Sequence, residues 1–420
     1  MIQSEYQIAF RPCIRDDILL GPPLRAGGKT IFYLKDTFTS WFYRIGVKEH
    51  FLISRMDGSR SLQELNDEYL AEFGRPLNEG SWAGLFALLE KRQLLANTAD
   101  TAKLEDLKRA FAERKKRENR GLLRRRFAFI RPDSILEKLL PWFQFMFSRT
   151  FVLPALLCVI ALEIFIGFHL TSIVASIWPE QGGIWSYILF IMLVWIFAVI
   201  HETAHGLTCK KFGGGVSEMG LVWRYLTIFP YCKIDDVMLF HNRWYRVYAA
   251  FAGIFVNFLS LIPFGLFWAF TPVHSLVHTI SALMLLSFNL MIFVNFVPFI
   301  ELDGYFMLSH ALNMADLRKE AHQFWQRGLL KIVLKRGSGN VGLSRWDTWV
   351  YLIYGFFSLV ITGGFLATMA FYWFFLVKYW LGGPIALGLF LLIALVLVYR
   401  ELGRRKIAPM PQLLQRVLMV

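Results

Sequence analysis

Two histidines and a glutamate near the end of a long apolar stretch form the motif His201-Glu202-x-x-His205. Histidines four residues apart lie one turn apart on one face of a helix, so both imidazoles can bind a single zinc ion. The Glu202 carboxylate can then take a proton from water at the metal. Ionisable groups in an apolar helix are costly and indicate function. The sequence therefore predicts His201 and His205 as metal ligands and Glu202 as the catalytic residue.

A second motif supplies what the first one lacks. Zinc that keeps one position open for water needs a third protein ligand. Asp303 ends a later apolar stretch, in the segment that runs from Asn295 through Pro298 to Asp303-Gly304. Pro298 and Gly304 break helical regularity, and backbone freed at membrane depth is tolerated only against protein or a wet cavity. We expect the Asp303 carboxylate to reach the same metal.

The composition places these motifs in a membrane protein. Hydrophobic residues make up 56% of the 420 and aromatic residues 16%. We therefore expect a polytopic α-helical membrane protein with about six transmembrane helices and a soluble portion attached. The net charge of +14 fits cytoplasmic loops and lipid headgroups, so no nucleic-acid partner is expected. The predicted spans are 150–173, 185–212, 246–271, 276–299, 348–377 and 381–400.

Lys and Arg set the predicted orientation. The connections 174–184 and 272–276 contain neither residue and should face outward. Both termini are then expected to be cytoplasmic. The basic stretch 102–131 is expected to be a linker helix over anionic headgroups, and 135–147 an amphipathic interfacial segment.

The pair of motifs, HExxH with NxxPxxxLDG, resembles the site-2 protease family of intramembrane zinc metallopeptidases over about residues 185–310. The resemblance implies an enzyme with zinc as its cofactor. Ala252-Gly253 and Asn257 are similar to the family's AGPxxN element, with Ile254 in place of the proline. The residues that the resemblance implies for the metal and for catalysis are His201, His205, Asp303 and Glu202. Asn257 and Asn295 are candidates to hold an extended substrate strand or its oxyanion.

Residues 1–100 carry the signals of a small α+β, winged-helix-like cytoplasmic domain. Alternation of apolar and polar residues over 31–47 predicts a β-hairpin, and a short helix should follow and stop at Asp57-Gly58. Ser61 and Glu64 form a capping box for a second helix, and Asn78 caps a third.

This order of elements resembles the PqqD-like family, which binds leader peptides by strand addition at a sheet edge. The alternative is a helical cap that binds no ligand. The predicted domains are 1–100 for this module, 101–148 for the basic linker and interfacial helix, 149–406 for the transmembrane metallopeptidase, and 407–420 for a cytoplasmic tail. A fusion of this kind resembles bacterial peptide zinc metalloproteases found with secretion machinery.

Together these features predict a zinc endopeptidase that cuts a membrane-associated or leader-bearing peptide near the cytoplasmic face. Its partners would be that peptide, the lipid bilayer and an export machinery. Two alternatives stay open: a non-cleaving export or maturation component that binds peptide, and a proton-coupled transporter, which would bind no zinc. The four scattered cysteines indicate no thiolate zinc site.

Overall fold

Two compact units make up the computed structural model. One comprises Met1–Leu20, Leu34–Lys115 and Val360–Val420, and the other comprises Gly21–Tyr33 and Lys116–Leu359. The structure describes residues 10–118, 124–177, 183–224, 227–273, 275–334, 343–385, 387–389, 391–392 and 395. The predicted tail, 407–420, lies outside these residues.

Within the described residues, five helices are long and apolar enough to cross a membrane, which indicates a multi-pass membrane protein. Five of the predicted spans therefore have a counterpart in the structure. Of the sixth, 381–400, the structure describes 381–385, 387–389, 391–392 and 395, and it is not among the five. The five helices are α7 (Arg149–Ala175), α8 (Gly183–Lys211), α9 (Arg243–Phe270), α10 (Leu276–Phe296) and α13 (Arg345–Leu381).

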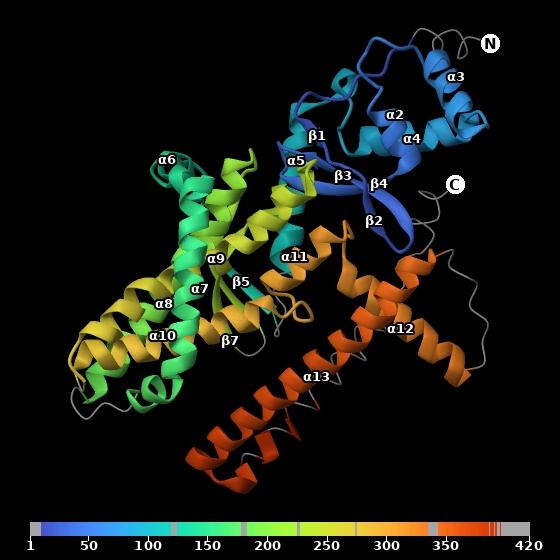
Figure 1. Ribbon diagram of the computed structural model, residues 1–420. Coiled ribbons are helices and arrows are strands. Elements are labelled where there is room, and N and C mark those ends of the chain that lie inside the picture. The colour runs from blue at the N-terminus through green and yellow to red at the C-terminus, as the bar shows by residue number, and fades with distance from the viewer. Residues whose placement is uncertain are drawn as a thin grey trace. The chain divides into compact units, whose positions relative to one another are not determined.

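Helices α7, α8, α9 and α10 pack into one bundle around α9 (Figure 1). Within the candidate spans, half of the α9 and α10 positions are buried, against 17% or fewer in α7 and α8. Ile254 and Leu261 of α9 meet Leu285 and Phe288 of α10 in the core of the bundle. Helix α9 is therefore the element against which the others are placed.

A three-stranded antiparallel sheet accompanies the bundle. It consists of β5 (Arg124–Ile130), β6 (Glu218–Arg224) and β7 (Thr227–Lys233), in that order. The prediction of one helix over 102–131 is thus wrong in its second half. Helix α5 (Thr101–Glu118) covers the first half, and 124–130 is a strand because its backbone pairs with β6. Long-range pairing overrides local propensity in such segments.

The elements between the strands and the spans are short. Helix α6 (Asp133–Phe143) and the 3₁₀ turn η2 (Gln144–Phe147) occupy the predicted interfacial segment, and Trp142 is largely exposed there. The 3₁₀ turn η3 (Asp235–Leu239) leads from β7 to α9. Helices α11 (Asp303–Ala311) and α12 (Leu317–Leu334) follow α10.

The first sheet is built around β3 (Lys29–Asp36). Strands β1 (Ile18–Leu20) and β2 (Leu24–Ala26) pair with its two halves, and β4 (Trp41–Gly46) pairs with it as well. The predicted hairpin over 31–47 is therefore present as β3 and β4. Strand β3 runs through the boundary between the two units.

Three helices follow the hairpin, as the sequence predicted. They are α2 (Val47–Ile53), α3 (Leu62–Phe73) and α4 (Glu79–Lys91), with a 3₁₀ turn η1 (Ala96–Thr98) after them. Ser61 accepts from the Glu64 amide while the Glu64 carboxylate accepts from the Ser61 amide, so the capping box is confirmed. The Asn78 cap is confirmed too, because its side chain accepts from Ser81 N–H.

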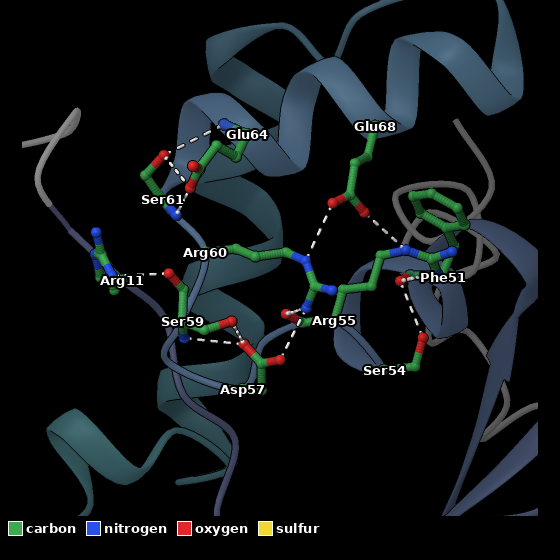
Figure 2. Close-up of polar contacts among 10 residues, drawn as sticks. All are labelled: Arg11, Phe51, Ser54, Arg55, Asp57, Ser59, Arg60, Ser61, Glu64 and Glu68. Carbon is green, nitrogen blue, oxygen red and sulfur yellow. Dashed lines mark hydrogen bonds and ion pairs between the residues drawn. The ribbon is translucent and has the colours of Figure 1, made fainter.

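An exposed network of ion pairs links α2 to α3 (Figure 2). Arg55 and Arg60 both donate to the Glu68 carboxylate, at 2.9 and 3.0 Å. Arg60 also donates to Asp57 at 2.8 Å. Each charge in this network has an opposite charge beside it, so no ligand is needed to explain these charged residues.

Candidate metal centre

Three side chains from two helices meet inside the bundle. His201 and His205 lie on α8, and Asp303 is the first residue of α11. One Asp303 oxygen lies 3.0 Å from His201 Nε2, and the other lies 3.4 Å from His205 Nε2. Both imidazoles are 5% exposed. The structure thus brings together the three residues that the sequence proposed as metal ligands, although 98 positions separate His205 from Asp303.

The ring nitrogens of the two histidines are oriented as metal ligands would be. His205 Nδ1 lies 2.7 Å from the Ala249 carbonyl oxygen, which can only accept, so Nδ1 carries the proton. In the neutral ring Nε2 is then a bare acceptor. It faces a carboxylate oxygen at 3.4 Å and His201 Nε2 at 3.2 Å. The ligand atoms of His201, His205 and Asp303 lie close enough together to hold one metal ion, and they form the one such set in the described residues.

Glycine at position 253 lets α9 approach both imidazoles. A Cβ on Gly253 would lie 2.4 Å from His201 Nε2 and 2.5 Å from His205 Nε2, closer than Cβ contacts in proteins allow. The backbone of α9 therefore forms one wall of the site. In the sequence, Gly253 was noted only as part of the Ala252-Gly253 element. That motif did not predict that Gly253 lies against His201 and His205.

A second glycine sets the path of the chain between α10 and Asp303. A Cβ on Gly304 would lie 2.5 Å from the Phe296 carbonyl oxygen and 2.6 Å from that of Asn295. The start of α11 therefore folds back directly onto the end of α10. Asn295 contributes its backbone to this contact, and the predicted role of its side chain in substrate binding stays a prediction.

Glu202 lies beside the donor set and is held by strand β7. The Cys232 backbone N–H donates to Glu202 Oε2 at 2.8 Å, which leaves the other carboxylate oxygen as an acceptor. Burial raises the pKa of the Cys232 thiol. The sequence gave no signal for this contact, because any residue except proline supplies the same N–H.

Asn257 lies one turn beyond Gly253 on α9 and is fully buried. Within the described part of the chain neither its amide nitrogen nor its amide oxygen has a hydrogen-bond partner. A buried polar group without a partner is costly, and such groups in native structures call for an explanation. The predicted role of Asn257 in substrate binding stays a prediction.

Comparison of the chain with protein-family models, with curated proteins and with solved structures finds no match. The evidence for a metal-binding site is therefore the geometry of His201, His205 and Asp303 and the motifs in the sequence.

Proposed function

We propose that the protein is a zinc-dependent intramembrane endopeptidase of the site-2 protease type. The observation that carries the proposal is the convergence of His201, His205 and Asp303 with the Glu202 carboxylate beside them. Its substrate would be a membrane-associated or leader-bearing peptide cut near the cytoplasmic face of a bacterial inner membrane. Both termini would lie in the cytoplasm, with a sixth span over 381–400.

His201, His205 and Asp303 would hold the metal. Bound zinc supplies a Lewis acid that polarises a peptide carbonyl and lowers the pKa of a water to about 7. Three protein ligands suit such a catalytic site, because one coordination position stays open. The ring orientation fixed by the Ala249 carbonyl supports His205 as a ligand through Nε2.

Glu202 would act as the general base. Its Oε2 is held by the Cys232 N–H, and its other oxygen would accept a proton from the attacking water. The same carboxylate would then pass that proton to the leaving amine. Asn257, with a buried amide that lacks a partner in the described chain, would bind an extended substrate strand or its oxyanion. A helical substrate must unwind locally first, since its carbonyls are otherwise hydrogen-bonded.

The N-terminal module would select the substrate. The order of a hairpin and three helices supports a PqqD-like, winged-helix-like domain. Strand β4 pairs with β3 on one side and is the last strand on that side of the sheet within the described residues. A leader peptide could extend the sheet at such an edge.

The test is a comparison of Glu202→Gln with the unmodified chain. The full-length protein is purified and its zinc content is measured, and the membranes of cells that carry each version are searched for new peptide N-termini. We expect equal zinc and a loss of Glu202-dependent cleavage of about 10²–10⁴-fold. Glu163→Gln, which changes a carboxylate of α7, is the matched control and should alter neither quantity.

The other outcomes identify the alternatives. Zinc in the unmodified chain with no new N-termini that depend on Glu202 would replace the hydrolase with a non-cleaving export or maturation component. Absence of zinc from the unmodified chain would remove the metal centre and favour a proton-coupled transporter.

A further inference from the structure

Asp303 sits at the first position of α11, a helix of only nine residues. A helix of this length is marginally stable alone, so its packing against α9 and the contacts at its two ends place the Asp303 carboxylate. The first end is placed by the close approach of Gly304 to the end of α10. The carboxyl end of α11 is placed by contacts of residues that are not metal-ligand candidates.

Asn313 is the residue on which those contacts meet. Its backbone is left-handed, with φ of 55°, a conformation that asparagine and glycine tolerate best. Its Nδ2 donates to the Pro23 carbonyl oxygen at 2.9 Å, and its Oδ1 accepts from Arg246 Nη2 at 2.6 Å. One amide side chain thus joins the residues after α11 to both α9 and the segment before β2.

Strand β2 pairs with the same segment through its backbone. Arg25 N–H donates to the Asn313 carbonyl oxygen at 2.9 Å, and Ala315 N–H donates to the Arg25 carbonyl oxygen at 2.8 Å. Arg25 and Met314 form a parallel bridge. The Arg25 guanidinium also pairs with Asp347, which is 2% exposed. The residues after α11 therefore have a strand on one side and α9 on the other.

Arg246 is a buried cation on the bundle's central helix, 1% exposed. Among the described residues, its Nε and Nη1 have no hydrogen-bond partner, and Asn313 Oδ1 is the acceptor of its Nη2. A buried charge is costly unless it is paired or hydrogen-bonded, so this one acceptor is strongly favoured. Burial, together with the nearby Arg246 charge, lowers the pKa of His310 to about 3, so His310 stays neutral beside it.

Helix α9 therefore contacts both parts of the candidate metal centre, the two histidines of α8 and the segment that follows α11. Gly253 and the Ala249 carbonyl place the two imidazoles, and Arg246, seven residues before Gly253, holds the segment after α11. Seven residues of helix span about 10 Å. The distance between the rings and the carboxylate is therefore set along a single rigid helix.

We propose that Asn313 and Arg246 are positioning residues of the metal centre, which hold the carboxyl end of α11 against α9 and so fix the Asp303 carboxylate beside His201 and His205. This role rests on the proposed function. Neither residue touches the metal or the substrate. Their effect is on the geometry of the third ligand, as is known for groups that orient ligands from outside the coordination sphere.

The test uses two substitutions at Asn313 in the full-length protein. Asn313→Gly keeps the left-handed backbone accessible and removes both side-chain contacts. Asn313→Asp keeps an acceptor for Arg246 and removes the donor to Pro23. Zinc affinity is measured by competition with a chromophoric chelator, and the ligand geometry is read from the visible absorption of the Co²⁺-loaded protein. Asn78→Gly, a change at the α4 cap, is the control.

We expect Asn313→Gly to lower zinc affinity about 10–100-fold and to change the Co²⁺ spectrum. Asn313→Asp should retain affinity within a few-fold, and Asn78→Gly should match the unmodified chain. Equal affinity and an unchanged spectrum in Asn313→Gly would overturn the positioning role while leaving the metal centre intact. If Asn313→Gly does not fold, Asn313→Asp decides the question. A loss of zinc affinity of 10-fold or more in Asn313→Asp, which keeps the acceptor for Arg246, would overturn the proposal that the Arg246 contact positions Asp303. Failure of the unmodified chain to bind zinc or Co²⁺ would overturn the proposed function and this role together.

Discussion

The N-terminal module and the candidate metal centre arrange their polar side chains differently. In the module, Arg60 lies between Asp57 and Glu68, so cations and anions alternate (Figure 2). In the candidate metal centre, His201 Nε2 and His205 Nε2 lie 3.0 and 3.4 Å from the two Asp303 oxygens. The first arrangement pairs opposite charges, whereas the second groups ligand atoms that could hold one metal ion.

Burial alone does not separate the two regions. The module also contains a buried pair, since Asp36 is fully buried and accepts from Arg15 Nη2 at 2.8 Å. Asp36 accepts as well from Phe38 N–H and the Thr39 hydroxyl. Every oxygen of that carboxylate therefore has a donor. The candidate metal centre differs in that three residues of metal-ligand type converge there, and Asp303 Oδ2 and His201 Nδ1 have no hydrogen-bond partner among the described residues.

The largest effect is expected from Asp36→Ala. Without Asp36, Arg15 loses one of its acceptors and keeps Asp17 and the Gln93 carbonyl, while Phe38 N–H and the Thr39 hydroxyl lose theirs. Each buried donor left without a partner costs about 1–3 kcal/mol. Hydrogen exchange of the full-length chain should show the loss of protection in 34–115, with zinc affinity unchanged. Unaltered protection in this segment would mean that the pair contributes no more than an exposed one.

Gly253→Ala should act on the other region. Its Cβ would lie within 2.5 Å of both imidazole nitrogens, and overpacking of this kind costs about 1–3 kcal/mol. We expect zinc affinity to fall about 10–100-fold, as measured by chelator competition, while hydrogen exchange in the N-terminal module stays the same. Gly167→Ala is the control, because a Cβ there meets nothing within 4 Å. Equal zinc affinity in the two variants would contradict the close approach of α9.

The smallest effect is expected from Glu68→Gln. Its carboxylate is 40% exposed and pairs with Arg55 and Arg60. Exposed ion pairs contribute about 0–1 kcal/mol and weaken as salt screens them. Thermal unfolding in low and high salt should show a small difference from the unmodified chain that shrinks at high salt. A loss comparable with that of Asp36→Ala would remove the distinction between exposed and buried pairs.

Local signals in the sequence predicted much of the fold. Ser61, Glu64 and Asn78 cap their helices as expected, because capping depends on residues within a few positions of each other. Five spans could be located because membrane helices require long apolar stretches. The meeting of Asp303 with the two histidines followed from placing two motifs at equal depth.

Long-range pairings could not be predicted in this way. Residues 124–130 are rich in arginine and suggested a helix, but they form β5 because β6, almost 90 positions later, offers a partner strand. Arg246 carried a signal, since a charge within an apolar helix is unusual. Nothing in the sequence identified Asn313 as its acceptor, 67 residues away.

The pairing of Arg25 with residues 313–315 determines which part of the chain the membrane-spanning portion needs. The sequence suggests a boundary near residue 100, between the N-terminal module and the membrane-spanning portion. A polypeptide that began there would lack a strand that the downstream portion uses, leaving the Asn313 carbonyl, the Ala315 amide and Asp347 without the groups that they bind. The membrane-spanning portion is therefore complete only with the three residues of β2 from the N-terminal end of the chain.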